Sequence, residues 1–556
     1  MLNAIFTKFN IIYTMKTNKS FKIIYIFFAV FVIHTVRINS QPVSLLWNQL
    51  YGYSSNTNDV ERDMVSDASG NIYITGFTTI STGNNDIITL KYNSSGVLQW
   101  AAKYSGNANG NDEGISIAFD NSGNVYVTGY TASPSSQDFI TIKYNSQGVQ
   151  QWANLQNGVG NTADAGYAVF VDNSSNIYVT GALENKLAVI KYNSSGGQQW
   201  IQYFNESNYS YGQGSDIEVD ASGNVFVTGS ASHNTTGRNY VTLKYSSSGT
   251  QLWSQIYNGP GNNNDEPYAM KLCNNGNVAV TGKSKGSGTN DDIATLCYNS
   301  NGILQWEQRY TTVGDDYGYS VTSDASNNVF ICGLTGGNPE KYIIIKYNSS
   351  GAQQWFKEHQ GSSSSNVFGG AYKVVCNTNG DVYATGIVEN NSTYLDILTV
   401  KYNSSGTLIW SQTYASPYTQ KAYSLFANDN GVIYVSGFSY IDTTAKNDIL
   451  TLKYQDNTVS VNQISSQIPS GFSLDQNYPN PFNPSTKIRY HIPNSGNAEI
   501  KIFDITGREM AVLVNEHHAP GIYEAEFNGS YYSSGVYFYT LKSGEFTETK
   551  KMILVK

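Results

Sequence analysis

The sequence predicts an all-β protein, with an eight-bladed β-propeller of four-stranded blades followed by a small C-terminal β-sandwich. The composition is 13% aromatic and only 13% charged, with 51 Gly, which is typical of short strands joined by tight turns. The word "LKYNSSGVLQW" (Leu90–Trp100) recurs along the chain in similar forms. The eight Trp follow one another at intervals of 53, 52, 48, 53, 53, 49 and 55 residues, a period close to that of a propeller blade.

Each repeat contains four strand-like runs, and the first unit shows them clearly. The runs are rich in β-branched and aromatic residues and are bounded by Gly, Asn, Asp or Ser. Both faces of each run are apolar, as expected for strands packed between neighbouring sheets. The four runs of the first unit are Asp63–Asp67, Asn71–Phe77, Asp86–Tyr92 and Val97–Tyr104.

The connections between these runs are of two kinds. "DASGN" (Asp67–Asn71) and "NSSG" (Asn93–Gly96) are short hairpin turns in which Gly accommodates a positive φ. Thr78–Asn85 and Ser105–Gly114 are longer, and their counterparts vary between repeats. Alternate connections of a meander lie at opposite ends, so one end of the molecule is expected to carry variable loops, where binding sites are usually built.

The number of repeats predicts how the ring closes. The second strand ends eight times, at Gly76, Gly129, Gly181, Gly229, Gly282, Gly333, Gly386 and Gly437. The third strand also ends eight times, at Tyr92, Tyr144, Tyr192, Tyr245, Tyr298, Tyr347, Tyr402 and Tyr454. No Trp follows Tyr454, whereas Ser44–Tyr51 contains Trp47 without the preceding word. We therefore expect eight blades over residues 41–457, with the N-terminal strand completing the last blade and removing an exposed edge.

Two recurring patterns, "DxSGNxYxTG" and "KYNSxGxxxW", resemble the bacterial β-propeller repeat family called SBBP. The resemblance covers nearly all of residues 44–454. It implies a propeller and no fixed activity.

The C-terminal region has a different composition. Residues 458–471 form a polar linker, and residues 472–556 contain several short strand-like runs with a hairpin-turn signal at Ile505–Glu509, which together predict a β-sandwich. This region resembles the type A C-terminal sorting domain of the type IX secretion system. The matching residues are Asn477, Tyr478, Pro479, Asn480, Pro481, Phe482, Asn483, Pro484, Gly507, Arg508, Gly521, Tyr523, Gly535, Tyr537 and Lys551.

That resemblance implies the route of the protein in a Gram-negative bacterium. The chain would be exported by Sec to the periplasm and then across the outer membrane, to remain at the cell surface or be released. The sorting domain would make the type IX machinery its partner.

The N-terminus is consistent with export. Lys16, Lys19 and Lys22 precede the apolar run Ile23–Ile33, which is short for a membrane span. We therefore predict a signal peptide over residues 1–40, with Met15 as an alternative start, and no transmembrane span in the mature chain.

Composition also excludes several classes of function. The net charge of −9 disfavours nucleic-acid binding. Cys273, Cys297, Cys332 and Cys376 fit no zinc spacing. The predicted propeller contains only two His, so a His-based metal centre or Ser/His/Asp triad is disfavoured. We predict no cofactor, no metal and no catalytic residue.

One pair of recurrent residues suggests an interaction within each blade. Lys precedes the last Tyr of the third strand in seven repeats, and Asp begins the first turn in five. In the fifth repeat both change together, to Cys297 and Cys273, which suggests that the two positions are neighbours. We expect an Asp–Lys pair across the second strand in five blades. A Cys273–Cys297 disulfide is disfavoured, because first and third strands lie roughly 9–10 Å apart.

The long-loop end supplies the candidate ligand-binding residues. Tyr side chains from fourth strands enter these loops, and acidic residues recur there; with the Asn-rich loops they would suit a sugar or a peptide. Packing of the Tyr and solvation of the acids are the alternatives. The candidates are Tyr104, Asp112, Glu113, Tyr257, Asp265, Glu266, Tyr310, Asp315 and Asp316.

The uniformity of the repeats favours a non-catalytic exported propeller that binds a glycan or a protein. A secreted carbohydrate-active enzyme, either a lyase or a hydrolase, is the first alternative, because propellers host both. It would require unlike residues to converge near the centre of the ring. A purely structural surface-layer component is the second alternative, and the sequence leaves the enzymatic question open.

Overall fold

The computed structural model describes residues 42–556 except 53–56, 82, 109, 135, 161, 289, 338, 361–368, 390–394, 441–445, 459–460 and 530–531. The predicted signal peptide and Met15 lie outside the described residues. All regular structure in the described part of the chain is β, arranged in ten four-stranded sheets. These residues include no helix that is long and apolar enough to cross a membrane.

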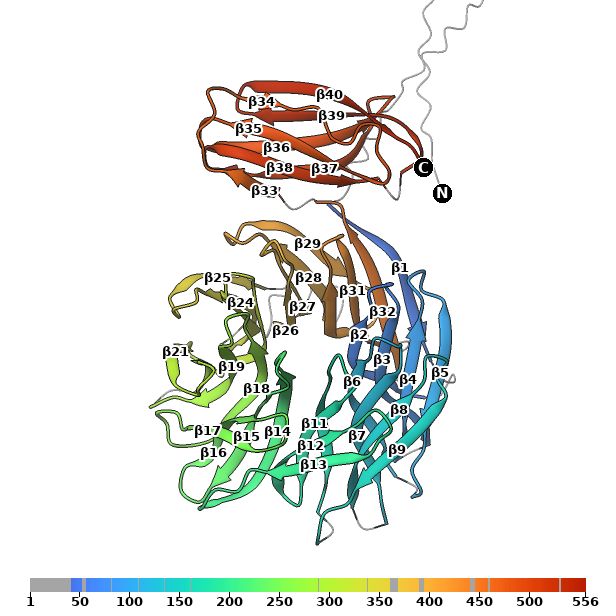
Figure 1. Cartoon of the computed structure of the whole chain (residues 1–556), viewed down its shortest axis with the longest axis vertical. Helices are drawn as coiled ribbons and strands as arrows, with labels where there is room; N and C mark the ends of the chain where they lie inside the picture. Colours follow the sequence, from blue (N-terminus) through green and yellow to red (C-terminus); the bar gives the residue numbers. More distant parts are fainter. Residues whose placement is uncertain are drawn as a thin grey trace, which may run out of the picture. The chain divides into compact units, whose positions relative to one another are not determined.

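Eight of the described sheets lie between Val43 and Asp456, and in each of them the neighbouring strands run antiparallel (Figure 1). Sheets 1 to 4 consist of β2 (Asp59–Ser66), β3 (Ile72–Ser81), β4 (Asn84–Tyr92) and β5 (Leu98–Tyr104); β6 (Glu113–Phe119), β7 (Val125–Ala132), β8 (Gln137–Tyr144) and β9 (Gln150–Gln156); β10 (Ala165–Val171), β11 (Ile177–Leu183), β12 (Lys186–Tyr192) and β13 (Gln198–Tyr203); and β14 (Tyr209–Val219), β15 (Val225–His233), β16 (Gly237–Tyr245) and β17 (Gln251–Tyr257).

Sheets 5 to 8 have the same form. They consist of β18 (Asp265–Leu272), β19 (Val278–Lys285), β20 (Asp291–Tyr298) and β21 (Leu304–Tyr310); β22 (Tyr317–Ser323), β23 (Val329–Thr335), β24 (Lys341–Tyr347) and β25 (Gln353–His359); β26 (Gly369–Cys376), β27 (Val382–Glu389), β28 (Leu395–Tyr402) and β29 (Leu408–Tyr414); and β30 (Gln420–Ala427), β31 (Val432–Tyr440), β32 (Asn447–Asp456) and β1 (Val43–Tyr51).

The chain ends meet in sheet 8. The strand predicted from Ser44–Tyr51 is β1, and it pairs antiparallel with β32, with Trp47 opposite Lys453. The first strand of each sheet contacts the first strand of the next, and β30 contacts β2. These eight first strands, here called the inner strands, therefore form a closed ring, and those labelled in Figure 1 surround its centre.

The recurrent word joins each sheet to its neighbour. The indole of Trp100 donates a hydrogen bond to the Ser146 carbonyl in the turn of the following sheet, at 3.0 Å. Gly148 in that turn has a φ of +78°, and a Cβ there would lie 2.6 Å from the Trp100 ring. Only glycine satisfies both constraints. The recurrent sequence therefore forms a contact between neighbouring sheets. It is repeated because every sheet packs against another sheet of the same kind.

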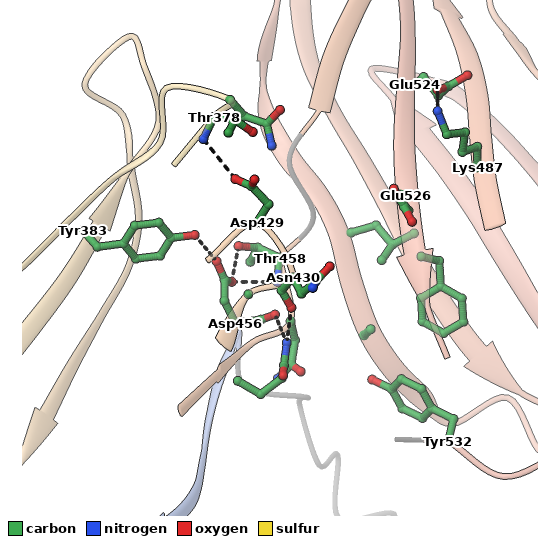
Figure 2. Close-up of a pocket in the computed structure, with 17 residues that line it drawn as sticks. Thr378, Tyr383, Asp429, Asn430, Asp456, Thr458, Lys487, Glu524, Glu526 and Tyr532 are labelled. Carbon is green, nitrogen blue, oxygen red and sulfur yellow. Dashed lines mark hydrogen bonds and ion pairs between the residues drawn. The ribbon is translucent and has the colours of Figure 1, made fainter. Parts of the chain in front are cut away.

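Trp410 is an exception, because no such turn follows it in sheet 8. Its indole donates instead to Asp456, at 3.1 Å. Figure 2 shows Tyr383 and Thr458 directed at the same carboxylate, and the Tyr383 hydroxyl donates to it at 3.0 Å. Lys401 lies between Asp456 and Asp381, with N–O distances of 2.8 and 2.9 Å. Coulombic attraction outweighs burial and holds the pKa of Lys401 well above its usual value.

The expected Asp–Lys pairs do not form, because the aromatic side chain of a second-strand residue lies between the carboxylate and the ammonium. Asp67 accepts the backbone N–H groups of Ser69 and Asn71, both at 2.9 Å, and the Tyr73 hydroxyl at 3.1 Å. The Lys91 ammonium lies over the Tyr73 ring, 5.0 Å from its centroid. In other sheets the equivalent Lys donates to a Ser carbonyl of the next turn; these are Lys143, Lys191, Lys244, Lys346 and Lys453.

The fifth repeat replaces all three members of this arrangement. Cys273, Ala279 and Cys297 occupy the positions of Asp, Tyr and Lys, and all three side chains are buried. The two cysteines are free thiols in the structure. Burial raises the pKa of Cys297 to about 12, so this thiol is protonated and packs as an apolar group.

The last two sheets lie in residues 461–556 and share one apolar core, which includes Phe482, Ile500 and Tyr539. They consist of β33 (Val461–Ser465), β38 (Gly521–Asn528), β35 (Ser485–Ile492) and β34 (Ser473–Leu474), and of β37 (Glu509–His518), β36 (Gly496–Asp504), β39 (Gly535–Ser543) and β40 (Phe546–Leu554). The predicted linker 458–471 is too long, because Val461–Ser465 pairs with β38. Backbone hydrogen bonds suffice for such a polar edge strand, so its side chains carry little signal.

Candidate functional site

Three of the predicted loop acids are buried rather than solvated. Asp112, Asp265 and Asp316 are at most 1% exposed. Asp265 accepts backbone N–H groups from Gly259 at 2.7 Å and from Lys285 at 3.0 Å. These carboxylates hold each long loop against the hairpin of the following sheet, so the expectation of solvated charge is wrong for them. They recur because the loops that carry them use the same carboxylate to accept backbone N–H groups.

The predicted Tyr side chains also have partners within the fold. The Tyr257 hydroxyl donates to Glu307 at 2.6 Å, and that of Tyr310 donates to Glu358 at 3.1 Å. Tyr104 packs against a cluster of buried residues in sheets 1 and 2. The alternative of strand-end packing describes these three residues.

The remaining predicted acids are Glu113, Glu266 and Asp315. Glu113 pairs with Arg62 and accepts the Tyr130 hydroxyl at 2.7 Å. Glu266 pairs with Arg238 at 3.0 Å. Asp315 is exposed and accepts a backbone N–H at 3.0 Å. Of the nine predicted residues, Glu113 and Glu266 are the two at the edge of the site described next.

Every inner strand carries one extra residue relative to its neighbour. The pairing register shifts at the same place in all eight sheets, for example between Glu61 and Asp63 in β2. Such β-bulges re-aim a side chain and are common beside functional sites. The bulged residues are Arg62, Ile115, Tyr167, Ser215, Tyr268, Tyr319, Tyr372 and Tyr423.

Four of these residues form a continuous aromatic surface, here called the tyrosine arc: Tyr268, Tyr319, Tyr372 and Tyr423. Their ring centroids are separated by 5.7, 5.2 and 5.1 Å in that order. All four rings are partly exposed. The four tyrosines are the third or fourth residue of inner strands of seven or eight residues, so the arc lies just on the long-loop side of the strand middle, toward the end where the sequence predicts binding.

Cations of the chain already cover aromatic rings beside the arc. The Arg62 guanidinium lies over Phe77 at 5.5 Å, and that of Arg238 lies over Tyr211 at 5.2 Å. The Lys283 ammonium lies 5.7 Å from the centroid of Tyr317. Among the described residues, no Lys or Arg lies over Tyr319, Tyr372 or Tyr423.

A second ring of residues follows the bulges, one position further along the inner strands. It consists of Asp63, Ser116, Ala168, Asp216, Ala269, Ser320, Lys373 and Ser424. Asp63 accepts the Ser116 hydroxyl at 3.1 Å, and Asp216 accepts the Met270 N–H at 2.8 Å. Burial raises the pKa of Asp216 to about 6.

Glu61 precedes the bulge of sheet 1, where the other inner strands carry Gly, Ala or Pro. It is 0% exposed. Burial raises its pKa to about 8, although the hydroxyl of Ser424 opposes the shift. Glu61 is therefore a neutral carboxylic acid at pH 7. The described residues contain no group of three or more His, Cys, Asp or Glu that would hold a metal ion.

Comparison with protein families agrees with both resemblances. Residues 476–556 match the secretion system C-terminal sorting domain, and residues 99–134 and 199–234 match the SBBP β-propeller repeat. The chain therefore carries propeller repeats and a type IX sorting domain, and it is exported to the cell surface or the extracellular space. The sorting-signal residues Asn480–Pro484, Gly507, Arg508, Gly521, Gly535, Tyr537 and Lys551 all lie within the matched range.

Comparison with individual proteins adds no functional argument. The chain matches no curated protein. Sqt1 from Chaetomium thermophilum is 9% identical with a TM-score of 0.46, over 73% of this chain and 100% of that chain. A PL25 ulvan lyase is 10% identical with a TM-score of 0.41, over 72% and 95%. The propeller domain of the trilobed protease from Pyrococcus furiosus is 7% identical with a TM-score of 0.34, over 61% and 97%.

Proposed function

We propose that this chain is an exported eight-bladed β-propeller that binds a glycan without catalysis, through the tyrosine arc. Its domains would be a propeller over residues 41–457 and a C-terminal β-sandwich, which starts at β33 rather than at residue 472. Sheets 1 to 8 would be the blades, which the closed ring of inner strands supports. The sandwich is supported by the core that its two sheets share.

The observation that carries this proposal is where the repeats differ. The outer hairpins repeat one word, whereas the bulges of the inner strands hold Arg, Ile, Ser or Tyr. Maintaining a ring requires no tyrosine at this position, because sheets 1, 2 and 4 close without one. Partly exposed aromatic faces in a row are a binding surface with little entropy to lose on contact.

The test is a glycan array followed by titration of the best ligand. Replacing Tyr319 and Tyr372 together with Ala should weaken binding at least about tenfold, because two stacking faces are lost. Tyr478→Ala is the matched control, since Tyr478 is 80% exposed and belongs to the C-terminal region. Unchanged affinity in the double variant would place the glycan elsewhere, and a protein ligand alone would contradict the proposal.

The second ring of residues, one position after the bulges, favours one alternative, which is a carbohydrate-active enzyme. Asp63, Asp216 and Lys373 are charged, whereas the other equivalent positions hold Ser or Ala, and this is the asymmetry that an enzyme requires. A carboxyl group with a pKa near 6, such as Asp216, is suited to general acid–base chemistry. Turnover of a polysaccharide by the wild type, lost in Asp216→Asn, would establish the enzyme. Binding without turnover across a broad panel would favour the non-catalytic proposal.

A further inference from the structure

One part of the tyrosine arc lacks a cation that the neighbouring sheet supplies. In sheet 5, the Lys283 ammonium lies over the Tyr317 ring and 3.5 Å from the Asp291 carboxylate. Glu266 also pairs with it, at 3.6 Å. Lys283 is thus an ammonium held between an aromatic face and carboxylates beside the arc.

Sheet 6 repeats this arrangement without the ammonium. Counting from the paired Gly282 and Gly333, Leu334 occupies the position of Lys283. Counting from Tyr298 and Tyr347, Glu340 occupies the position of Asp291. The carboxylate is therefore kept while its cation is replaced by an apolar side chain. Among the described residues, no hydrogen bond or ion pair to the Glu340 carboxylate is found.

The aromatic face is also kept, although another residue provides it. Gly370 occupies the position of Tyr317. A Cβ at Gly370 would lie 3.7 Å from the Tyr372 ring and 3.8 Å from Leu334, so the ring of Tyr372 borders the place left by the missing side chain. Glu340 lies beside this place, because a Cβ at the adjacent Gly369 would be 3.3 Å from the Glu340 carbonyl oxygen. After burial and Tyr423, the Glu340 carboxylate also contributes to raising the pKa of Tyr372 to about 12.

We infer that Glu340, Tyr319 and Tyr372 bind the protonated amine of an amino sugar in a glycan. This inference rests on the proposed function and names the ligand class of the same site. An ammonium over aromatic faces is attracted by their quadrupoles, and a carboxylate beside it adds charge pairing. The adjoining rings of Tyr423 and Tyr268 extend the surface over four sheets, which suits a chain of sugar rings better than a single lysine side chain.

The test compares three probes by calorimetric titration: a glucosamine hexamer, an N-acetylglucosamine hexamer and hexalysine. The glucosamine hexamer should bind more tightly than its acetylated form, which carries no charge. Glu340→Gln should weaken glucosamine binding about tenfold and make it less sensitive to salt. Glu206→Gln, an exposed acid in the loop before β14, is the matched control and should leave affinity within about twofold.

Leu334→Lys is a second variant, which places the ammonium of sheet 5 in sheet 6. Leu334 is partly exposed, so the fold should accept the change. The new lysine should occupy the site and abolish the preference for the glucosamine hexamer. Together with Glu340→Gln, it tests the site from both sides, by removing the acid and by filling the cation position.

The outcomes separate this inference from the proposed function. Equal binding of both sugar hexamers, unaffected by Glu340→Gln, would overturn the inference and leave the glycan-binding proposal standing. Failure of both hexamers and of a wider glycan array would overturn both. Hexalysine binding more tightly than the glucosamine hexamer, with the same dependence on Glu340, would contradict the sugar and point to a basic protein segment.

Discussion

The outer hairpins and the inner strands of the eight sheets follow opposite rules. The outer hairpins repeat a Trp that contacts the turn of the next sheet, a turn Gly that receives the Trp of the preceding sheet, and, in seven repeats, a Lys. The inner strands share only a backbone feature, the bulge, and their bulged side chains differ from sheet to sheet. The residues repeated in the outer hairpins form the contacts between sheets. The bulged residues of the inner strands vary although their backbone does not, so their side chains are available to bind a ligand.

From this comparison we expect the largest change in the free energy of unfolding at the place where the repeated contact between sheets is interrupted. Lys401 is buried between Asp381 and Asp456, because sheet 8 lacks the turn that receives its counterparts. Lys401→Met should lower the free energy of unfolding by about 3–5 kcal/mol, since it leaves two buried carboxylates without their cation. Urea denaturation measures this. A loss below about 1 kcal/mol would mean that this closure is no more demanding than the other contacts.

The second prediction concerns Glu61, an inner-strand residue whose contribution to the free energy of unfolding depends on pH. The pKa of Glu61 rises from 4.5 to about 8 on folding, so the folded state binds more protons than the unfolded state between these values. Its contribution to stability is present below pH 4.5 and is lost as the pH rises to about 8. Glu61→Gln should therefore remove a decline of up to a few kcal/mol between pH 5 and pH 9.

Denaturation of the wild type and Glu61→Gln at pH 5, 7 and 9 measures this difference. Asp216 also has a raised pKa and adds a decline of the same sign, so the comparison between the two proteins isolates Glu61. Parallel pH profiles would show that the Glu61 carboxyl group is ionised in the folded protein at neutral pH.

The smallest effect belongs to a single repeated contact. Trp200 donates a hydrogen bond to the Ser247 carbonyl at 3.2 Å, and its ring is otherwise partly exposed. Trp200→Phe should cost about 1 kcal/mol, because the ring is kept and one hydrogen bond is lost. Chemical denaturation checks this value. A loss as large as that of Lys401→Met would erase the proposed difference between regular and interrupted contacts.

The sequence predicts the repeated parts well because their residues are constrained in every sheet. Trp47 indicated a displaced strand, and β1 completes sheet 8 as expected. The Asp–Lys hypothesis located both residues near one another, but it overlooked Tyr73, whose ring separates them. The buried acids were misjudged because a recurrent Asp in a polar loop has the same composition whether it is solvated or accepts backbone N–H groups.

The tyrosine arc was missed for a different reason. A bulge shifts the alternation of a strand by one residue, so a simple two-residue period assigns the side chain to the wrong face. One signal was present: Tyr167, Tyr268, Tyr319, Tyr372 and Tyr423 lie at equal distances before the Gly that ends the second strand. The spacing of Glu340 gives its position in the repeat but not its partner, and the equivalent partner is shown only by the contact between Lys283 and Asp291.

A crystal structure of the protein with the glucosamine hexamer tests the central claim most directly. We expect sugar rings stacked on Tyr319 and Tyr372, with an amine beside Glu340 and no contact to the outer hairpins. Sugar bound instead at the fourth-strand residues Tyr257 or Tyr310, with the tyrosine arc empty, would contradict the claim that the varied bulges of the inner strands hold the ligand.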